Sequence, residues 1–109
     1  MVYGRIWGEW SFEDVREFRK RAVADPDYQV GIRQLFDFTE ATGFEMTVKE
    51  MLRMGSSVPK EMSGRRAYVV PDPANFGMLR AYQVTADKDD NSLQVCRSMD
   101  EARAWLGLD

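Results

Sequence analysis

The residues that could do chemistry are few, because the 109-residue chain contains no His. Without His, neither a Ser-His-Asp nor a Cys-His nucleophile arrangement can be assembled. The usual zinc sites also lose their nitrogen ligand, and the single cysteine, Cys96, cannot replace it. The chain has no GxGxxG or GxxxxGKS/T segment, which argues against the two common phosphate-binding loops. The sequence therefore predicts a protein that is not an enzyme and that binds no metal or cofactor.

Three features of the sequence still imitate chemical sites. Residues 87–91 (DKDDN) look like the start of an EF-hand calcium loop, but Ser92 replaces its Gly and Ser98 its bidentate Glu. Cys96 occupies an alternating position of a predicted strand, which favours a small core residue over a reactive thiol. Paired carboxylates and Arg80 are the groups that an enzyme hypothesis would use, but carboxylates at helix starts also stabilise the helix.

The net charge and the overall composition favour a soluble domain that does not bind nucleic acid. The net charge is −3, and an acidic domain repels the phosphate backbone. Because 44% of the residues are hydrophobic, one core and a single domain over residues 1–109 are expected. The lone cysteine, the lack of a leader-like N-terminus and the lack of an apolar run of about 20 residues predict a cytoplasmic protein without an integral membrane segment.

Strand-like and helix-like segments alternate along the chain. Strands are predicted at residues 2–7, 32–38, 67–70 and 93–96, with Gly8 ending the first and Gly43 breaking the chain after the second. Helices are predicted at residues 12–24 and after the N-cap patterns that begin at Thr47, Asp72 and Ser98. This order predicts an α/β fold, βαβαβαβα, with a mainly parallel four-stranded sheet and packed helices.

Several segments resemble the SpoIIAA-like family of STAS-related domains. Residues 67–82 (AYVVPDPANFGMLRAY) are similar to the apolar strand and Phe-Gly-Met-x-Arg helix start of that family. Residues 98–107 (SMDEARAWLG) resemble its ending, and residues 8–14 (GEWSFED) its first strand-to-helix junction. The resemblance implies the SpoIIAA-like fold and a regulatory or binding role, without implying an activity.

This sequence differs from the family pattern in two respects. Family members usually begin with an additional strand. Either the first strand here has a bare edge, which favours pairing with another chain, or the start of the native gene differs. Related anti-anti-sigma factors carry a phosphorylatable Ser after an Asp-Leu-Ser strand end. Residues 37–39 take the place of that strand end, and the Ser position falls at about Met46. Thr47 is therefore a candidate phosphosite, although it is already explained as a helix cap.

The candidate contact surface lies beyond the carboxyl ends of the strands, where open α/β sheets gather ligands. Gly77 inside a helix costs about 1 kcal/mol relative to Ala, so it indicates close packing against the first helix or a partner. Phe76 and Trp10 lie off the apolar stripes and are expected at the surface. The candidate partner or ligand surface comprises Trp10, Thr39, Thr47, Phe76, Gly77, Met78, Arg80 and Tyr82.

Three functional hypotheses follow. The first is a non-catalytic regulatory or protein-interaction module that docks on another protein or on a second copy of itself. The alternative is a carrier or sensor of a small apolar, lipid-like ligand held beneath the second helix. The methionines around that helix, Met46, Met51, Met54 and Met62, suit either an adaptable surface or plain core filling. The third hypothesis is an enzyme that uses carboxylates and Arg80.

Overall fold

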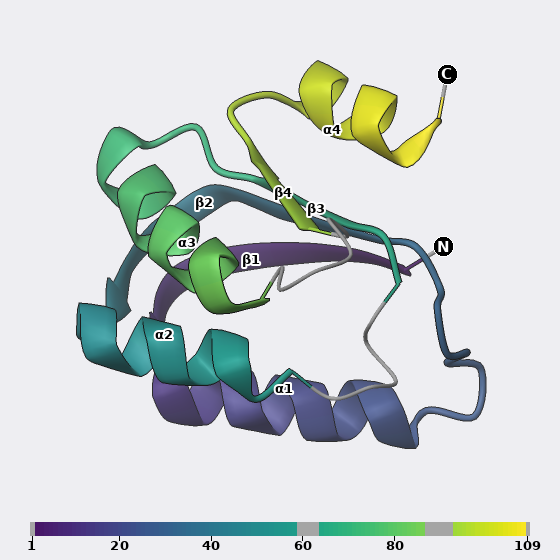
Figure 1. Ribbon diagram of the computed structural model, residues 1–109, viewed down its shortest axis with the longest axis horizontal. Coiled ribbons are helices and arrows are strands. Elements are labelled where there is room, and N and C mark those ends of the chain that lie inside the picture. Colours follow the sequence, from purple (N-terminus) through teal and green to yellow (C-terminus); the bar gives the residue numbers. More distant parts are fainter. Residues whose placement is uncertain (1, 59–63, 87–92, 109) are drawn as a thin grey trace.

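Four parallel strands alternate with four helices in the part of the chain that the computed structural model describes, residues 2–58, 64–86 and 93–108 (Figure 1). Adjacent strands pair in the order β1-β2-β3-β4, so β1 and β4 form the edges of this sheet. The elements are β1 (Val2–Ser11), α1 (Phe12–Ala24), β2 (Gln34–Glu45), α2 (Val48–Ser56), β3 (Arg66–Val69), α3 (Pro73–Ala86), β4 (Leu93–Cys96) and α4 (Met99–Leu106). The predicted βαβαβαβα order is confirmed.

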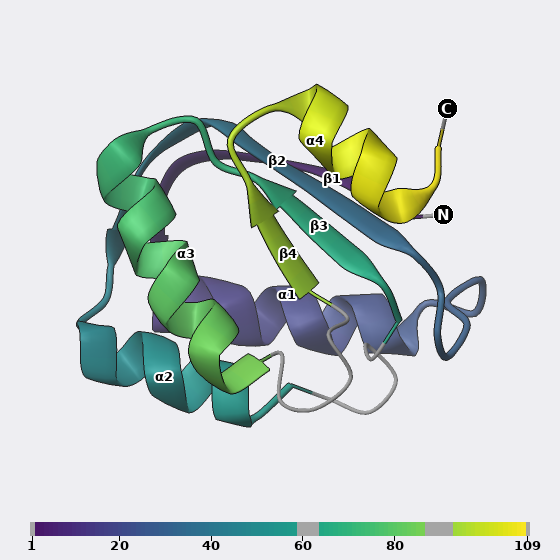
Figure 2. The same ribbon diagram turned by 45° about the horizontal axis from the view of Figure 1, so that its top comes forward.

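The sheet separates two hydrophobic cores. Helices α1, α2 and α3 lie on one side of the sheet and α4 on the other (Figures 1 and 2). Side chains alternate along β2, so that Phe36 packs toward α1, α2 and α3 while Leu35 packs with Ala102 and Leu106 of α4. Both β2 side chains are buried, as the continuous apolar sequence of this strand predicts.

The helix starts are set by local hydrogen bonds. The Thr47 hydroxyl accepts from the Glu50 backbone N–H, and the Glu50 carboxylate accepts from the Thr47 N–H, which completes a capping box. Ser11 forms the same arrangement before α1. Asp72 Oδ1 accepts from the backbone N–H of Asn75 at the start of α3. Since these contacts lie within four residues, the sequence predicts them correctly.

The first two strands are longer than predicted. Strand β1 continues past Gly8, which adopts a φ of +73°, and the register with β2 shifts between Gly8 and Glu9. Strand β2 continues through Gly43, which pairs with Glu9, to Glu45. The predicted strand end at Gly8, the predicted end of the second strand at residue 38 and the break at Gly43 are therefore wrong, because pairing between the strands outweighs the local weakness of glycine. Residues 37–39 consequently lie within β2 instead of at its end.

The core-facing side chains of α2 and α3 are set by the packing of these helices. Val48 is exposed, whereas Met51 and Met54 are buried in the core. These two methionines are core filling, and Met62 lies outside the described residues. On α3 the buried residues include Leu79 and Tyr82, because this helix packs against both the sheet and α2. Among the described residues, no helix is long and apolar enough to cross a membrane.

Candidate functional site

Aromatic rings form a continuous network between the sheet and the helices α1 to α3. Phe36 of β2 lies at its centre, with its ring centroid 5.4 Å from that of Phe18 and 5.6 Å from that of Tyr68. Tyr68 of β3 stacks on Tyr82 of α3 with a centroid distance of 5.9 Å. Further ring pairs extend the network: Trp10–Phe18, Phe38–Tyr68 and Phe38–Phe44. The network joins the strands to α1 and α3 through edge-to-face and stacked contacts.

A cavity of about 60 Å³ lies within this network, and we call it the inner cavity. Its lining combines apolar side chains with four residues that carry polar groups, Arg19, Arg66, Tyr68 and Tyr82. No Asp or Glu belongs to the described residues that line it. Pockets for drug-sized molecules measure about 300–1,000 Å³, so this cavity suits a much smaller molecule.

The Arg19 guanidinium is held at the inner cavity by neutral oxygen atoms. Its Nη2 donates to the Met54 carbonyl oxygen at 2.9 Å and to the Tyr82 hydroxyl at 3.0 Å. Its Nη1 donates to Ser57 Oγ at 3.3 Å. Met54 lies in the last turn of α2, where unsatisfied carbonyl groups carry partial negative charge. The helix terminus thus stabilises a cation for which the described residues supply no carboxylate partner.

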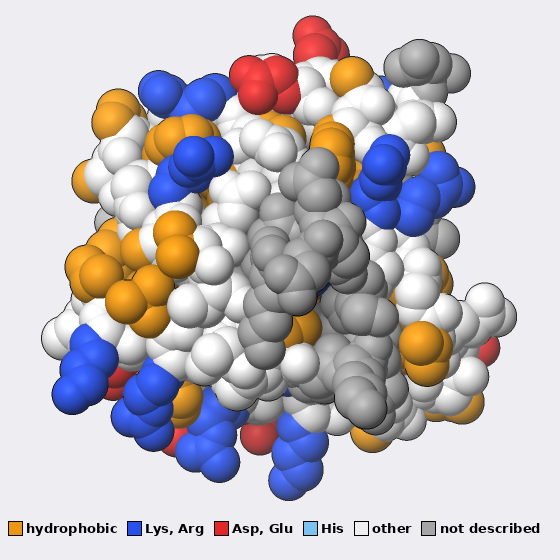
Figure 3. Space-filling view, viewed as in Figure 1, with side chains coloured by type: hydrophobic (Ala, Val, Ile, Leu, Met, Phe, Trp, Pro, Cys, Tyr) orange, Lys and Arg blue, Asp and Glu red, His pale blue; other side chains and the backbone are white. Residues whose placement is uncertain are grey.

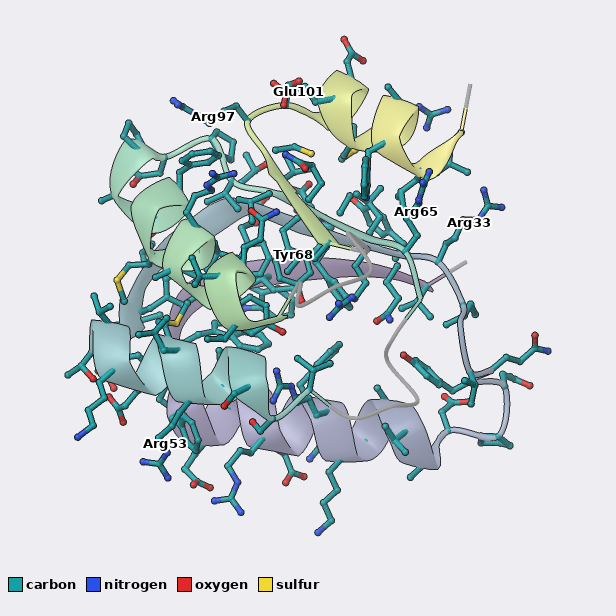
Figure 4. The ribbon with its side chains drawn as sticks, viewed as in Figure 1. Arg33, Arg53, Arg65, Tyr68, Arg97 and Glu101 are labelled. Atoms are coloured by element: carbon teal, nitrogen blue, oxygen red, sulfur yellow. The ribbon has the colours of Figure 1, made fainter. Side chains whose placement is uncertain are left out.

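The phenol groups at the cavity are hydrogen-bond donors. Burial raises the pKa of Tyr68 well above its usual value, and the neighbouring Tyr82 raises it further. The charges of Arg66 and Arg19 act in the opposite direction without offsetting burial. Tyr68 therefore stays protonated at neutral pH. In Figure 4 it lies between the sheet and α3, whereas Arg33 and Arg65 lie toward the other end of the sheet, near α4.

A second depression lies at the surface beside the edge strand β1, and we call it the β1–α1 hollow. Its volume is about 390 Å³. The residues that line it are Trp7, Glu9, Trp10, Asp14, Glu17, Phe18 and Arg21. Trp7 is 69% exposed, the most exposed aromatic side chain among the large hydrophobic residues described as exposed. The hollow thus combines aromatic side chains with a predominantly acidic rim.

The acidic rim continues onto Glu45 at the end of β2. A hydrogen bond with Glu9 and the charge of Glu9 raise the pKa of the Glu45 carboxyl, with smaller contributions from desolvation and from Asp14. The Glu45 and Glu9 carboxylates repel one another when both are ionised. A cation placed among these carboxylates would relieve that repulsion.

The structure places two of the predicted site residues at the inner cavity. Trp10 is half-buried and lines both the inner cavity and the β1–α1 hollow. Tyr82 is only 4% exposed, so it can contact a molecule in the cavity but not the surface of a protein partner. Thr39 is exposed on β2, where both its N–H and its hydroxyl donate to Asp37. Thr47 is exposed and caps α2.

The other four predicted residues on α3, which exclude Tyr82, lie apart from both sites. No atom lies within 4 Å of the position that a Gly77 Cβ would occupy, so the explanation of Gly77 by close packing against the first helix is wrong. The residue faces outward on the helix. Phe76 and Met78 are half-buried, and Arg97 stacks over the Phe76 ring at 5.1 Å. Arg80 is exposed and donates to Gln83. Figure 3 shows hydrophobic side chains gathered between α3 and the start of α2.

Cys96 is a structural residue. Its side chain is 1% exposed, and burial, with a smaller contribution from the charge of Glu101, raises the pKa of the thiol to about 11. A thiol with such a pKa is not ionised at neutral pH and is a poor nucleophile. No three His, Cys, Asp or Glu side chains in the described part of the chain are grouped to hold a metal ion. The calcium-like segment 87–91 lies outside the described residues.

The sequence interpretation missed Arg19, Arg66 and Trp7. Arg19 belongs to a helix with many charges of both signs, which is typical of a solvated helix face. Arg66 immediately precedes the predicted third strand and is buried to 2% exposure. The sequence pattern of the first strand does not determine whether the Trp7 side chain lies on the buried face or on the exposed face. No local signal identifies these residues, because their surroundings come from elements distant in the sequence.

Comparison with solved structures finds an uncharacterised protein of the DUF3478 family from Shewanella loihica PV-4, described as having a SpoIIAA-like fold. The match covers 94% of this chain and 80% of that chain, with a TM-score of 0.55 and 20% sequence identity. No protein-family model and no curated protein matches the chain. The similarity confirms the fold that the segments 8–14, 67–82 and 98–107 imply. The chain therefore has a SpoIIAA-like fold.

Proposed function

We propose that this chain is a non-catalytic interaction module that docks on a partner protein through β1 and the β1–α1 hollow. The observation that carries this proposal is an edge strand beside an aromatic hollow. Among the described strands, β1 pairs only with β2, so its other edge is open to a further strand. Strand β1 has 10 residues, which is long for an exposed edge. Addition of a partner strand to such an edge is a common mode of protein recognition.

Side chains on β1 support the same surface. Tyr3 and Trp7 are 51% and 69% exposed. Arg5, which lies between them on the same face, pairs with Glu40 of β2. Tyrosine, tryptophan and arginine are the residue types enriched at the centres of protein interfaces. The edge strand therefore offers both backbone hydrogen-bonding groups and aromatic anchors.

The acidic rim of the hollow defines the chemistry of the partner. Glu9, Asp14 and Glu17 line the hollow, and Arg21, the single cation among its described lining residues, is paired with Glu17 at 3.0 Å. Electrostatic complementarity favours a partner segment that carries Lys or Arg together with apolar residues. We therefore assign the site to a cationic β-strand of another protein.

A model peptide tests this proposal. The probe is a peptide of the same length as β1 in which Lys alternates with Val, and the control peptide has Glu in place of Lys. We expect the Lys peptide to shift the backbone amide resonances of β1 in NMR spectra and the Glu peptide to leave them unchanged. Trp7→Ala is expected to weaken binding of the Lys peptide by about 2 kcal/mol, because it removes the exposed aromatic anchor.

Val84→Ala is the matched control variant, because Val84 is 74% exposed on α3, away from the hollow. We expect it to bind the Lys peptide as the unmodified chain does. Equal binding of the two peptides, or equal losses for the two variants, would contradict the assignment of a cationic strand to this surface.

A second candidate function is the sensing of a small ligand. The inner cavity supports ligand sensing, because its lining combines aromatic and aliphatic side chains with a few polar groups. Its volume of about 60 Å³ favours a small molecule over a lipid-like one.

A further inference from the structure

The four described polar groups that line the inner cavity can all donate hydrogen bonds, and none of them is acidic. Two are guanidinium groups, from Arg19 and Arg66, and two are phenols, from Tyr68 and Tyr82. Guanidinium groups only donate hydrogen bonds, and the protonated phenols also have a hydrogen to donate. No described lining residue is acidic, and the Arg19 guanidinium donates to neutral oxygen atoms among the described residues, so an acceptor with negative charge complements Arg19.

The hydrogen-bond geometry leaves donors available to such an acceptor. The Tyr82 oxygen accepts from Arg19 at 3.0 Å, so the Tyr82 hydroxyl hydrogen must point elsewhere. The two phenol oxygens are 3.5 Å apart, at the outer limit of a hydrogen bond. An oxygen atom of a ligand placed near both phenols could accept a better hydrogen bond than the phenols form with each other.

An independent observation comes from Gln34, which pairs in register with Arg66. Its side chain lies on the same face of the sheet as Phe36, two residues further along β2, and Phe36 lines the cavity. Gln34 is fully buried, and in the described part of the chain neither the nitrogen nor the oxygen of its amide has a hydrogen-bond partner. Buried polar groups without partners are rare in proteins, and a bound water or other small polar group is one explanation of them. Gln34 is not one of the described residues that line the cavity, so it marks the polar side of the neighbouring core.

The remaining lining limits the size and polarity of the ligand. Away from the polar groups the cavity is bounded by Phe36, Phe38, Phe44, Leu79 and other apolar side chains. A volume of about 60 Å³ corresponds to roughly four to six water molecules. This space suits a short hydrocarbon chain.

We propose that the inner cavity binds a short-chain monocarboxylate. The carboxylate accepts hydrogen bonds from the Arg19 guanidinium and from the Tyr68 and Tyr82 hydroxyls, and the hydrocarbon chain lies against the aromatic network around Phe36. This inference rests on the second candidate function, ligand sensing, and is independent of docking at the β1–α1 hollow.

Butyrate and its neutral isostere butyramide test the proposal on the complete chain. Both are titrated while NMR resonances of the cavity side chains are followed, which measures dissociation constants even in the millimolar range. We expect butyrate to bind at least about tenfold more tightly than butyramide, since the negative charge of the carboxylate strengthens its hydrogen bonds to the Arg19 guanidinium. Arg19→Gln is expected to abolish that preference while leaving the affinity for butyramide unchanged.

Two variants control for effects on folding. Arg16→Gln removes an exposed arginine from the same helix, where it pairs with Glu13 and does not line the cavity. It is expected to keep the preference for butyrate. Tyr82→Phe removes one hydroxyl and retains the ring, so it should weaken butyrate binding more than butyramide binding even if Arg19→Gln does not fold.

The outcomes separate the two proposals. If neither compound shifts the cavity resonances, both ligand sensing and the carboxylate proposal are overturned. If both bind equally well, ligand sensing stands and the preference for an anion is overturned.

Discussion

Replacement of Phe36 by Ala is expected to lower the free energy of unfolding by about 3–5 kcal/mol. Phe36 is 4% exposed and lies between the rings of Phe18 and Tyr68. Its loss removes the centre of the aromatic network and leaves a cavity next to one that already exists. The small residue Gly4 faces the Phe36 ring from β1, so it cannot fill the space.

Urea unfolding followed by far-ultraviolet circular dichroism measures this effect. Val84→Ala provides the reference, because an exposed side chain on α3 is expected to change the free energy of unfolding by less than about 0.5 kcal/mol. A loss for Phe36→Ala of the same small size would contradict the central position assigned to this ring.

Replacement of Gly64 by Ala is expected to destabilise the chain by about 1–3 kcal/mol. An added Cβ would lie 2.3 Å from the Ile32 carbonyl oxygen and 2.5 Å from the Gly31 carbonyl oxygen. Both neighbours are backbone atoms leading into β2, so they cannot move as a flexible side chain would. The adjacent bond from the Gln34 N–H to the Arg65 carbonyl, 2.9 Å long, would be disturbed by the same shift.

Gly77→Ala is the matched substitution with the opposite expected sign. No atom lies near its added Cβ, and alanine is favoured over glycine inside a helix by about 1 kcal/mol. Thermal unfolding should therefore show a lower midpoint for Gly64→Ala and a higher midpoint for Gly77→Ala. A lower midpoint for both variants would show that Gly77 has a packing role that the structure does not give it.

The parts of the fold that depend on short-range interactions could be predicted from the sequence. Thr47 and Asp72 start helices through hydrogen bonds to residues three positions away, and that spacing is visible in the sequence. The alternation of strands and helices likewise implies parallel pairing. The ends of β1 and β2 could not be predicted at Gly8 and Gly43, because each strand is prolonged by the other.

The candidate sites were harder to predict, because they are assembled from distant segments. Arg19 reaches the inner cavity only because α2 places the Met54 carbonyl, and α3 the Tyr82 hydroxyl, beside it. A helical pattern assigns such a residue to the solvated face. Trp10 was predicted as a contact residue and does line both sites. The expected packing of Gly77 against the first helix is wrong, since no atom of the described chain lies near the position of its Cβ.

Hydrogen–deuterium exchange of the β1 amides tests the central proposal, docking of a cationic strand at the edge of β1, most directly. The exchange is measured with and without the Lys–Val peptide. Because an added strand would occupy the backbone groups of β1 that do not bond to β2, we expect the peptide to slow exchange within residues 2–11. Unchanged exchange in β1, with slowing confined to α3 or the inner cavity, would contradict the proposal.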